Sequence, residues 1–594
     1  MSAYAIATLQ GRLQRGEITL SGLVRVLCES LERGQPDIWI HRLTAAELQD
    51  RAAGLEALAE GYGASLYQRM PLYGVPFAVK DNIDVAGLPT TAACPEYRYI
   101  ADNDAFVVRR LLDAGAILVG KTNLDQFATG LVGVRSPYGL VRNAVNPAYV
   151  AGGSSSGSAV AVASGLVAFA LGTDTAGSGR VPAGFNGLVG LKPSRGLLSG
   201  AGVVPACLSL DCVSIFAADA ASAWRVTRVA AGYDADDPRS RRLDMLPVRR
   251  RHRRVAIPAA CEFFGDRQAE AAFAAAVDVL RRQPDITLRE VPFAVFAEAA
   301  ELLYDGPWVA ERQAAIGDFY QTRAEAIHPV VKGIIAKADQ FSAVDVFTAR
   351  YRLDELIRQA SLLLAETDLL VVPTAPCMPT IEAVLADPVR INSRLGYYTN
   401  FVNLMDMAAL AMPAPARGDG LPAGITLIGP AGADHYLAAT AAAWQGLFGA
   451  EDQSGQVTAT PLPFNEPSIE VAVVGAHLSG EPLNWQLIER GARKVGDAFT
   501  AGRYQLYALA NSQPAKPGLV RVSEGGESIA LEIWQMPLRC FGAFVADVPP
   551  PLGIGSVELA NGQWIKGFIC ESAGLTGAVD ITGFKGWRNY RATV

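Results

Sequence analysis

The stretch GTDTAGSGRVPAGFNGLVGLKPSRG, residues 172–196, is the part of the sequence that decides the fold and the chemistry. It is rich in glycine and other small residues, and it places Ser178 between two glycines. A serine hydroxyl is a weak nucleophile unless a neighbouring base activates it. The rest of the chain must therefore supply a base for this serine.

Histidine is the usual base, but the five histidines of this chain fall in no recognisable catalytic motif. None lies between residues 42 and 251, and the run around Ser178 lacks the strand-to-helix flanks of a nucleophile elbow. A Ser-His-Asp triad is a spatial arrangement, so the sequence leaves it without support rather than ruling it out. We therefore looked for a different base.

Lys80 ends the apolar run GVPFAVKD, residues 74–81, which is typical of a buried strand. Burying a charged lysine is costly, and burial lowers the pKa of the amine, so such a lysine is a candidate base. The alternative is an ion pair with Asp81 or Asp84 at the strand end. A second candidate partner is GGSSSGS at 152–158, for which the alternative is a capped helix start.

These segments together resemble the amidase signature family. Lys80, GGSSSGS at 152–158, GTDTAGS at 172–178 and GLKP at 190–193 match that family in content, order and spacing. Its members use a Ser-Ser-Lys triad with 24 residues between the serines, an interval that selects Ser154 and Ser178. The resemblance implies that Ser178 is the nucleophile, Ser154 the bridging serine and Lys80 the base.

The same resemblance implies two backbone features of the site. One is a cis peptide bond between Gly153 and Ser154. The other is an oxyanion hole formed by the N–H groups of Thr175, Ala176 and Gly177 with that of the nucleophile, where preorganised donors stabilise the charge that develops on the carbonyl oxygen. Ala176 stands where many relatives have glycine, a small departure from the pattern.

The run ELLYDGPWVAERQAAI, residues 301–316, suggests a site for an anionic substrate. Tyr304 and Arg312 are eight residues apart, so a continuous helix would place them on one face. Arginine forks a carboxylate, and the tyrosine hydroxyl adds a further hydrogen bond. The alternative is a surface arginine beside a half-buried tyrosine.

Two more segments narrow the resemblance to the allophanate hydrolase branch of the family. These are QFATGLVGVRSPYG at 126–139 and the C-terminal region from 469. The resemblance implies hydrolysis of allophanate (urea-1-carboxylate) in urea or s-triazine nitrogen catabolism, with ammonia released at the triad and the remainder broken down to ammonia and carbon dioxide. It assigns the substrate carboxylate to Tyr304 and Arg312, and a backbone contact to Gly130. The alternatives are an amidase for another small amide, malonamate- or biuret-like, and an amidase-like subunit of a tRNA-dependent amidotransferase.

The chain is organised in more than one unit, as its 594 residues suggest. Residues 1–65 predict surface helices, and the following residues to 449 alternate strand and helix patterns, which favours an α/β amidase-signature domain with a central mixed sheet flanked by helices. Residues 450–468 predict a linker, and residues 469–594 a smaller β-rich α+β domain.

The C-terminal domain resembles a γ-glutamylcyclotransferase-type fold in relatives, where it is proposed to assist decarboxylation of the intermediate and to mediate association. His477, in the loop GAHLSG, is its one histidine and a candidate acid/base catalyst. The alternative is a structural histidine after an apolar strand.

Composition limits the other functions and partners. The net charge of −7 disfavours binding to nucleic acid or anionic membranes, and the basic cluster at 240–254 is interpreted as a solvated connector. The eight cysteines are scattered without a CxxC pair, which argues against disulfides or zinc and for a reducing, cytoplasmic location. We expect no cofactor and no metal, a homodimer, and a separate biotin-dependent urea carboxylase upstream.

Overall fold

The structure is a computed structural model that describes residues 5–243, 245, 253–448, 468–510 and 512–593. The described residues before 449 form one compact unit, and those after 467 form another. The predicted linker at 450–468 lies, except for Ser468, outside the described residues, as does most of the second half of the basic cluster at 240–254.

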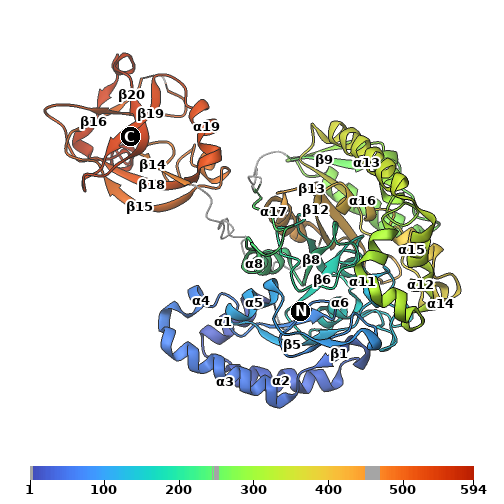
Figure 1. The fold of residues 1–594 in the computed structure, drawn as a ribbon. Coiled ribbons are helices and arrows are strands. Elements are labelled where there is room, and N and C mark those ends of the chain that lie inside the picture. The colour runs from blue at the N-terminus through green and yellow to red at the C-terminus, as the bar shows by residue number, and fades with distance from the viewer. Residues whose placement is uncertain (1–4, 244, 246–252, 449–467, 511, 594) are drawn as a thin grey trace. The chain divides into compact units, whose positions relative to one another are not determined.

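The larger unit is built on one sheet of eleven described strands, seen near its centre in Figure 1. Its inner strands are mixed, because β2 runs parallel to β5 and β6, whereas β8 is antiparallel to β6 and β7. In spatial order the strands are β1 (Trp39–Arg42), β5 (Ile117–Thr122), β2 (Pro76–Lys80), β6 (Phe169–Asp174), β8 (Cys212–Ala217), β7 (Val189–Lys192), β12 (Met407–Pro413), β13 (Gly424–Pro430), β11 (Leu369–Pro373), β9 (Arg253–Pro258) and β10 (Ile286–Val291). A separate short pair is formed by β3 (Pro89–Thr90) and β4 (Tyr99–Ile100).

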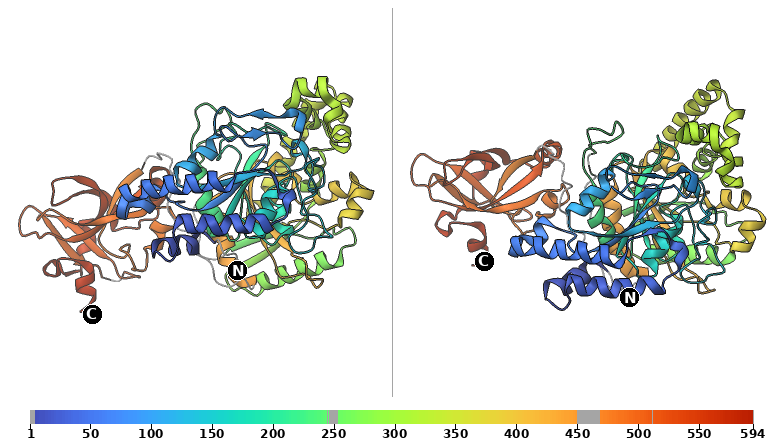
Figure 2. Two further views of the ribbon diagram at one scale, coloured as in Figure 1. Left: turned by 90° about the horizontal axis from the view of Figure 1, so that it is seen from below. Right: turned by 60° about the horizontal axis from the view of Figure 1, so that its bottom comes forward.

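Helices cover this sheet, and the predicted N-terminal helices gather at one side of the unit, in blue in Figures 1 and 2. There α2 packs on α3, and α3 contacts β5. The helices are α1 (Ile6–Gln14), α2 (Leu20–Arg33), α3 (Ala45–Tyr62), α4 (Leu66–Arg69), α5 (Phe106–Asp113), α6 (Ser156–Ala163), α7 (Val181–Phe185), α8 (Ala220–Ala230), α9 (Arg267–Arg281), α10 (Ala294–Glu301), α11 (Val309–Arg323), α12 (Pro329–Ile335), α13 (Ala343–Leu364), α14 (Ile381–Ala386), α15 (Arg390–Leu395), α16 (Asn400–Leu404) and α17 (Asp434–Gln445).

The sheet brings the two halves of the predicted triad together. Strands β2 and β6 are parallel neighbours, with Val79 opposite Leu171, so their carboxyl ends meet at one edge. Lys80 is the last residue of β2, and the loop that contains Ser178 follows β6 directly. Both strands are buried along their whole length, which matches their continuous apolar sequences.

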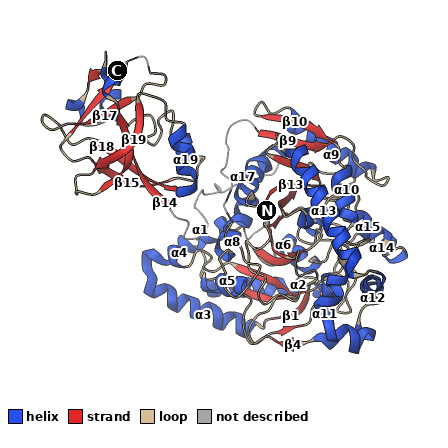
Figure 3. Cartoon of the chain, turned by 45° about the horizontal axis from the view of Figure 1, so that its top comes forward, coloured by secondary structure: helices blue, strands red, loops and turns tan. Residues whose placement is uncertain are grey.

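The smaller unit consists mainly of strands, shown in red in Figure 3. A five-stranded sheet has the order β15 (Arg493–Phe499), β18 (Ala530–Pro537), β14 (Ser468–Val473), β20 (Trp564–Cys570) and β19 (Leu552–Glu558). A three-stranded sheet has the order β17 (Pro517–Arg521), β16 (Tyr504–Ala508) and β21 (Val579–Asp580). The described helices of this unit are α18 (Trp485–Ile488), α19 (Leu538–Ala546) and α20 (Trp587–Arg591).

One condition of the sequence analysis is not met. Residues 301–316 do not form one continuous helix, because α10 ends at Glu301 and α11 begins at Val309. Tyr304 therefore lies in the turn between them, and Arg312 lies in α11. The sequence Asp-Gly-Pro at 305–307 explains the break, since proline and glycine interrupt helices.

No helix in the described part of the chain is long and apolar enough to cross a membrane.

Candidate active site

Lys80 is fully buried and contacts the predicted bridging serine. Its Nζ lies 2.8 Å from Ser154 Oγ and 2.8 Å from Thr173 Oγ1, and among the described residues it forms no ion pair. The alternative partners are occupied elsewhere: Asp81 pairs with Lys121, and Asp84 accepts hydrogen bonds from Thr90 and Tyr99. The interpretation of Lys80 as a strand-end ion pair is therefore wrong.

Burial changes the acid–base character of this lysine. Desolvation lowers the pKa of Lys80 from 10.5 to about 7, although Asp125, Asp211 and Asp174 oppose the shift; Arg312 adds to it. An amine with that pKa is largely neutral just above pH 7 and can accept a proton. The geometry and the pKa both suit a general base that acts on Ser154.

Ser154 is held in a tightly packed backbone segment just before α6. The peptide bond between Gly153 and Ser154 is cis, and the carbonyl of Ser154 accepts a hydrogen bond from Asp125 N–H at 3.0 Å. A Cβ atom on Gly153 would lie 2.1 Å from Asp125 Oδ2, so no larger residue fits there. The Asp125 carboxylate also accepts from the N–H groups of Val132, Gly133 and Arg135.

The loop around Ser178 is anchored by a buried ion pair that the sequence analysis did not single out. Arg180 donates to both carboxylate oxygens of Asp174, at 2.8 and 2.9 Å, and both side chains are fully buried. The same carboxylate accepts from the N–H groups of Gly177 and Gly179, at 2.8 and 3.0 Å. A bidentate pair that also satisfies backbone donors fixes the loop before substrate arrives.

Three of the four expected oxyanion donors are free. In the described part of the chain, no protein group accepts a hydrogen bond from the N–H of Thr175, Ala176 or Ser178. Gly177 differs, because its N–H already donates to Asp174. Its role is conformational: it has φ +140°, and a Cβ there would lie 2.4 Å from Thr399 Oγ1. The expectation that Gly177 supplies an oxyanion donor is thus not supported in this conformation.

Ser178, the predicted nucleophile, faces the loop that contains Gly130. Ser178 Oγ lies 3.5 Å from the carbonyl oxygen of Gly130, and its burial is nearly complete. No hydrogen bond joins Ser178 to Ser154 among the described side chains, so this structure contains the Lys80–Ser154 half of the relay. Catalytic hydrogen bonds often tighten only when substrate is bound.

Tyr304 and Arg312 meet in space despite the break between their helices. Arg312 Nη2 donates to Tyr304 Oη at 3.1 Å, and Nη1 donates to Thr129 Oγ1 at 2.9 Å. Arg312 is buried, Nε has no partner, and no carboxylate pairs with it among the described residues. The guanidinium also lies over the Tyr304 ring, 5.0 Å from its centroid. A buried guanidinium whose described hydrogen bonds go to hydroxyls is well suited to receive an anion.

Adjacent residues connect the two halves of the site. Thr129 contacts Arg312, and Gly130 contacts Ser178. Arg312 also lowers the pKa of Lys80 through its charge, which is consistent with their proximity. Thr129 and Gly130 are consecutive residues, so Arg312 and Ser178 contact the same short segment of the chain, an arrangement that suits a small substrate.

His477 lies in the smaller unit, just after β14. Its Nε2 is 2.7 Å from Gln486 Oε1, and its ring stacks on Phe568 with centroids 4.7 Å apart. Burial lowers the pKa of His477 to about 4, with contributions from the charges of Lys516 and Arg490. This histidine is neutral at pH 7, and its assignment as an acid/base catalyst stays a prediction.

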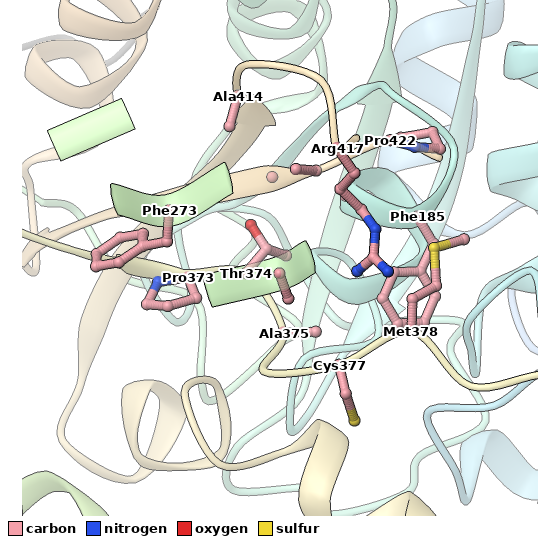
Figure 4. Close-up of a pocket in the computed structure, with 14 residues that line it drawn as sticks. Phe185, Phe273, Pro373, Thr374, Ala375, Cys377, Met378, Ala414, Arg417 and Pro422 are labelled. Atoms are coloured by element: carbon pink, nitrogen blue, oxygen red, sulfur yellow. The ribbon is translucent and has the colours of Figure 1, made fainter. Parts of the chain in front are cut away.

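Other features of the described chain do not add a second reactive centre. The cavity of about 30 Å³ in Figure 4 contains Arg417, but that guanidinium pairs with Asp266 and Asp419, and none of the predicted site residues lines it. No group of three or more His, Cys, Asp or Glu side chains in the described residues is arranged to hold a metal ion.

Comparison with known proteins identifies the family. The amidase family model matches residues 22–438, and the model of the allophanate hydrolase C-terminal domain matches residues 469–592. The chain belongs to the amidase family. It is an amidohydrolase, and the predicted fold class of an amidase unit with a smaller β-rich C-terminal domain is confirmed.

Its relatives include the urea amidolyase of Saccharomyces cerevisiae, 48% identical over 545 residues, which are 88% of this chain and 30% of that protein. The urea amidolyase of Lachancea kluyveri is 45% identical, over 97% of this chain and 32% of the relative. This chain thus spans about a third of the length of these relatives. Among solved structures, the Kluyveromyces lactis allophanate hydrolase is 42% identical with a TM-score of 0.88, covering 100% of this chain and 99% of that one.

Proposed function

We propose that this chain hydrolyses allophanate with a Ser178–Ser154–Lys80 relay. Neutral Lys80 accepts a proton from Ser154 while Ser154 accepts one from Ser178, and Ser178 Oγ attacks the amide carbonyl of the H₂N–CO group. The oxyanion is stabilised by the free N–H groups of Thr175, Ala176 and Ser178. The proton returns through Ser154 to the nitrogen, the C–N bond breaks, and ammonia leaves.

A water molecule then completes the reaction. It attacks the acyl-enzyme carbonyl and gives up a proton through the same relay, and the C–O bond to Ser178 breaks. The product is an N-carboxylated carbamate, which breaks down to ammonia and carbon dioxide. No group outside the chain is needed for the proton transfers, because Lys80 alternates between neutral and charged forms near its pKa of about 7.

The observation that supports an anionic substrate is the state of Arg312. Its buried guanidinium contacts Tyr304 and Thr129 but pairs with no carboxylate of the described chain. Thr129 is joined by one peptide bond to Gly130, which faces the nucleophile. In allophanate, the carboxylate carbon and the amide carbonyl carbon are joined through one nitrogen. We therefore expect a substrate whose carboxylate binds Arg312 to present its amide carbonyl near Ser178. The relatives named urea amidolyase and allophanate hydrolase support the choice of allophanate.

Ammonia release from the purified chain tests this function. We expect turnover of allophanate far above that of biuret and glutamine, with malonamate, which has the same carboxylate spacing, as the next best substrate. Equal rates on charged and uncharged amides would contradict the assignment. Glutamine turnover that depends on an added partner would favour the amidotransferase alternative.

We propose two further features of the same function. Allophanate is supplied by a biotin-dependent urea carboxylase, which agrees with the relatives named urea amidolyase being about three times as long as this chain. The C-terminal unit assists breakdown of the carboxylated product, with His477 as its candidate residue. Measuring the rates of release of the first and the second ammonia separately tests this role of the C-terminal unit.

Self-association into a homodimer is also part of the proposal, and α13 offers a surface for it. Its inner face is buried through Ala349, Leu353, Leu356 and Ala360, whereas Val344, Phe347, Tyr351 and Leu362 on its outer face are each more than half exposed. The helix lies on the outside of the amidase unit (Figure 1). The exposed side of α13 also carries both signs of charge, with Asp354 and Glu355 between Arg350 and Arg358. Two copies of the helix packed antiparallel can therefore form ion pairs as well as apolar contacts.

Sedimentation equilibrium of a Phe347→Ser/Tyr351→Ser variant tests that surface. We expect the wild type to be a dimer at micromolar concentration and this variant to be a monomer with unchanged helical content. Val26→Ser, on the exposed side of α2, is the matched control and should remain dimeric. A monomeric wild type would contradict the proposal.

A further inference from the structure

A short segment, residues 206–211, lies beside the nucleophile loop and has no role in the chemistry described so far. Strands β6 and β8 are antiparallel with Asp174 opposite Cys212, so Asp211 faces Thr175, the first residue after β6. The Thr175 hydroxyl donates to the Asp211 carboxylate. The same carboxylate accepts from the N–H of Ala206 at 2.7 Å and of Cys207 at 3.2 Å. Asp211 therefore joins the two ends of segment 206–211 by hydrogen bonds and also binds the Thr175 side chain.

The other side of the segment is fixed to the helix that contains Arg312. Ser209 N–H and Oγ donate to the two carboxylate oxygens of Glu311, at 2.6 and 2.8 Å. The Cys207 thiol donates to the Trp308 carbonyl at 3.8 Å. Both attachment points adjoin α11, and Glu311 is the residue directly before Arg312. The segment thus connects the start of the nucleophile loop to the anion-binding arginine.

The packing supports the same connection. Cys207 and Leu210 belong to one buried apolar cluster with Ala176 of the nucleophile loop and Tyr304 of the anion site. Asp211 has no cationic partner within ion-pair distance among the described residues, so its carboxylate is committed to hydroxyl and backbone donors. These contacts fix the position of the loop. The charge of Asp211 separately raises the pKa of Lys80, so variants of Asp211 are compared well above pH 7, where Lys80 is neutral in either case.

We propose that Asp211 is a positioning residue that holds the oxyanion loop through Thr175, and that segment 206–211 fixes the separation between the oxyanion donors and Arg312. The proposal rests on the function proposed above. Oxyanion donors are effective only when their direction is set in advance, and the Thr175 hydroxyl bond sets the first peptide of the loop. A fixed separation favours a substrate whose carboxylate and amide carbonyl are joined through one atom.

The first experiment removes the hydrogen bond without changing shape. In the full chain, Thr175→Val should lower kcat on allophanate about 10- to 100-fold, while KM changes less than about threefold. This decrease in kcat is no larger than the decrease expected when one oxyanion donor is removed. Thr175→Ser should restore most of kcat. Asp211→Asn should resemble Thr175→Val, and the double variant should be no worse than the worse single one, because both remove one contact.

The outcomes separate this inference from the function itself. A wild type without activity on allophanate contradicts the proposed function. An active wild type with unchanged kcat in Thr175→Val contradicts the positioning role, and a raised KM in Asp211→Asn alone would instead indicate a direct substrate contact. If Asp211→Asn does not fold, Thr175→Val decides, since it removes the same bond.

The second experiment loosens the attachment to α11. Malonamate and succinamate differ by one methylene between carboxylate and amide, so the ratio of their kcat/KM values measures how strictly the separation is held. We expect Glu311→Gln combined with Ser209→Ala to reduce that ratio at least threefold. Glu366→Gln, which changes an exposed glutamate that pairs with Arg289 on the surface, is the control and should leave the ratio unchanged. An unchanged ratio in the Glu311/Ser209 variant contradicts the spacing role.

Discussion

Lys80 and His477 are both buried, one in each unit, but burial shifts their pKa values to different parts of the pH range. Lys80 is buried among hydroxyls, and nearby carboxylates oppose the effect of desolvation, so its pKa settles at about 7. His477 is buried against the rings of Phe568 and Phe544, with only cations contributing charge, and its pKa falls to about 4. Desolvation lowers the pKa in both, but the lysine titrates near neutral pH whereas the imidazole stays neutral throughout that range.

The difference teaches that burial alone does not create a catalyst. Lys80 Nζ lies within hydrogen-bonding distance of a hydroxyl that can pass a proton to it, whereas the polar partner of the His477 ring in the described part of the chain is the amide of Gln486. A functional base needs both a pKa near the working pH and a proton donor in contact. The following predictions test that distinction, from the largest expected effect to the smallest.

Removing the relay should have the largest effect. Ser178→Ala, Ser154→Ala and Lys80→Ala should each lower kcat by more than about 10³-fold, because the three residues act as one unit. For the same reason the double variants should be little worse than the singles. Ammonia release, with circular dichroism to confirm folding, measures this. Independent, additive losses would mean separate structural roles.

Removing the anion-binding cation should have a smaller effect that depends on the substrate. Arg312→Ala should lower kcat/KM on allophanate roughly 10- to 150-fold, mostly through KM, since a charge-assisted contact contributes about 1.5 to 3 kcal/mol. Arg312→Lys should restore only part of it, because lysine lacks the fork. On an uncharged amide such as acetamide the penalty should nearly vanish. Equal losses on both substrates would assign Arg312 to the fold instead.

The pH profile should follow Lys80. The base acts when neutral, so kcat/KM should fall about tenfold per pH unit below pH 7 and level off above it. The carboxylates of Asp125, Asp211 and Asp174 raise the pKa of Lys80, and the charge of Arg312 lowers it. Arg312→Ala should therefore move the acid limb of the profile to higher pH, with acetamide as the substrate. An acid limb that stays in place in this variant would argue against Lys80 as the titrating group.

His477 should have the smallest effect on the first step. Because its imidazole is neutral at pH 7 and contacts only Gln486 by hydrogen bonding, His477→Gln should change release of the first ammonia less than about twofold. If His477 acts in breakdown of the carboxylated product, the variant should release the second ammonia more slowly than the wild type. NMR of the full chain, with His477→Gln to identify the resonance, should show titration near pH 4. A midpoint above pH 6 would contradict the described environment.

Much of the fold and the core of the site could be predicted from local sequence. The strand that ends at Lys80, the helix that follows Ser154 and the glycine-rich loop at Ser178 are each specified by residues close together in the chain. The β-rich character predicted for residues 469–594 likewise agrees with the two sheets of the smaller unit. These elements are recognisable because their apolar period or their small residues mark them directly.

The remaining parts depend on tertiary contacts that no local pattern encodes. Asp174 and Arg180 fix the nucleophile loop only once both are buried, and Thr129 contacts Arg312 from a position 183 residues earlier. A continuous helix over residues 301–316, the condition for placing Tyr304 and Arg312 on one helical face, does not form, because the chain breaks at Gly306 and Pro307, a turn pattern present in the sequence. The two side chains meet instead because Tyr304 lies in the turn that precedes α11.

The close approach of backbone at Gly153 and Gly177 bears on how such enzymes diversify. A methyl group at either position would collide with Asp125 or Thr399, so neither position accepts a side chain. The turn between α10 and α11 contains exposed Asp305 and half-buried Leu302 and Trp308, although Gly306 within it is constrained too, because a Cβ there would lie 2.4 Å from the Leu302 carbonyl oxygen. Directed evolution toward new amides should therefore yield most of its gains in residues 302–312, with the chemistry at Ser178 inherited unchanged.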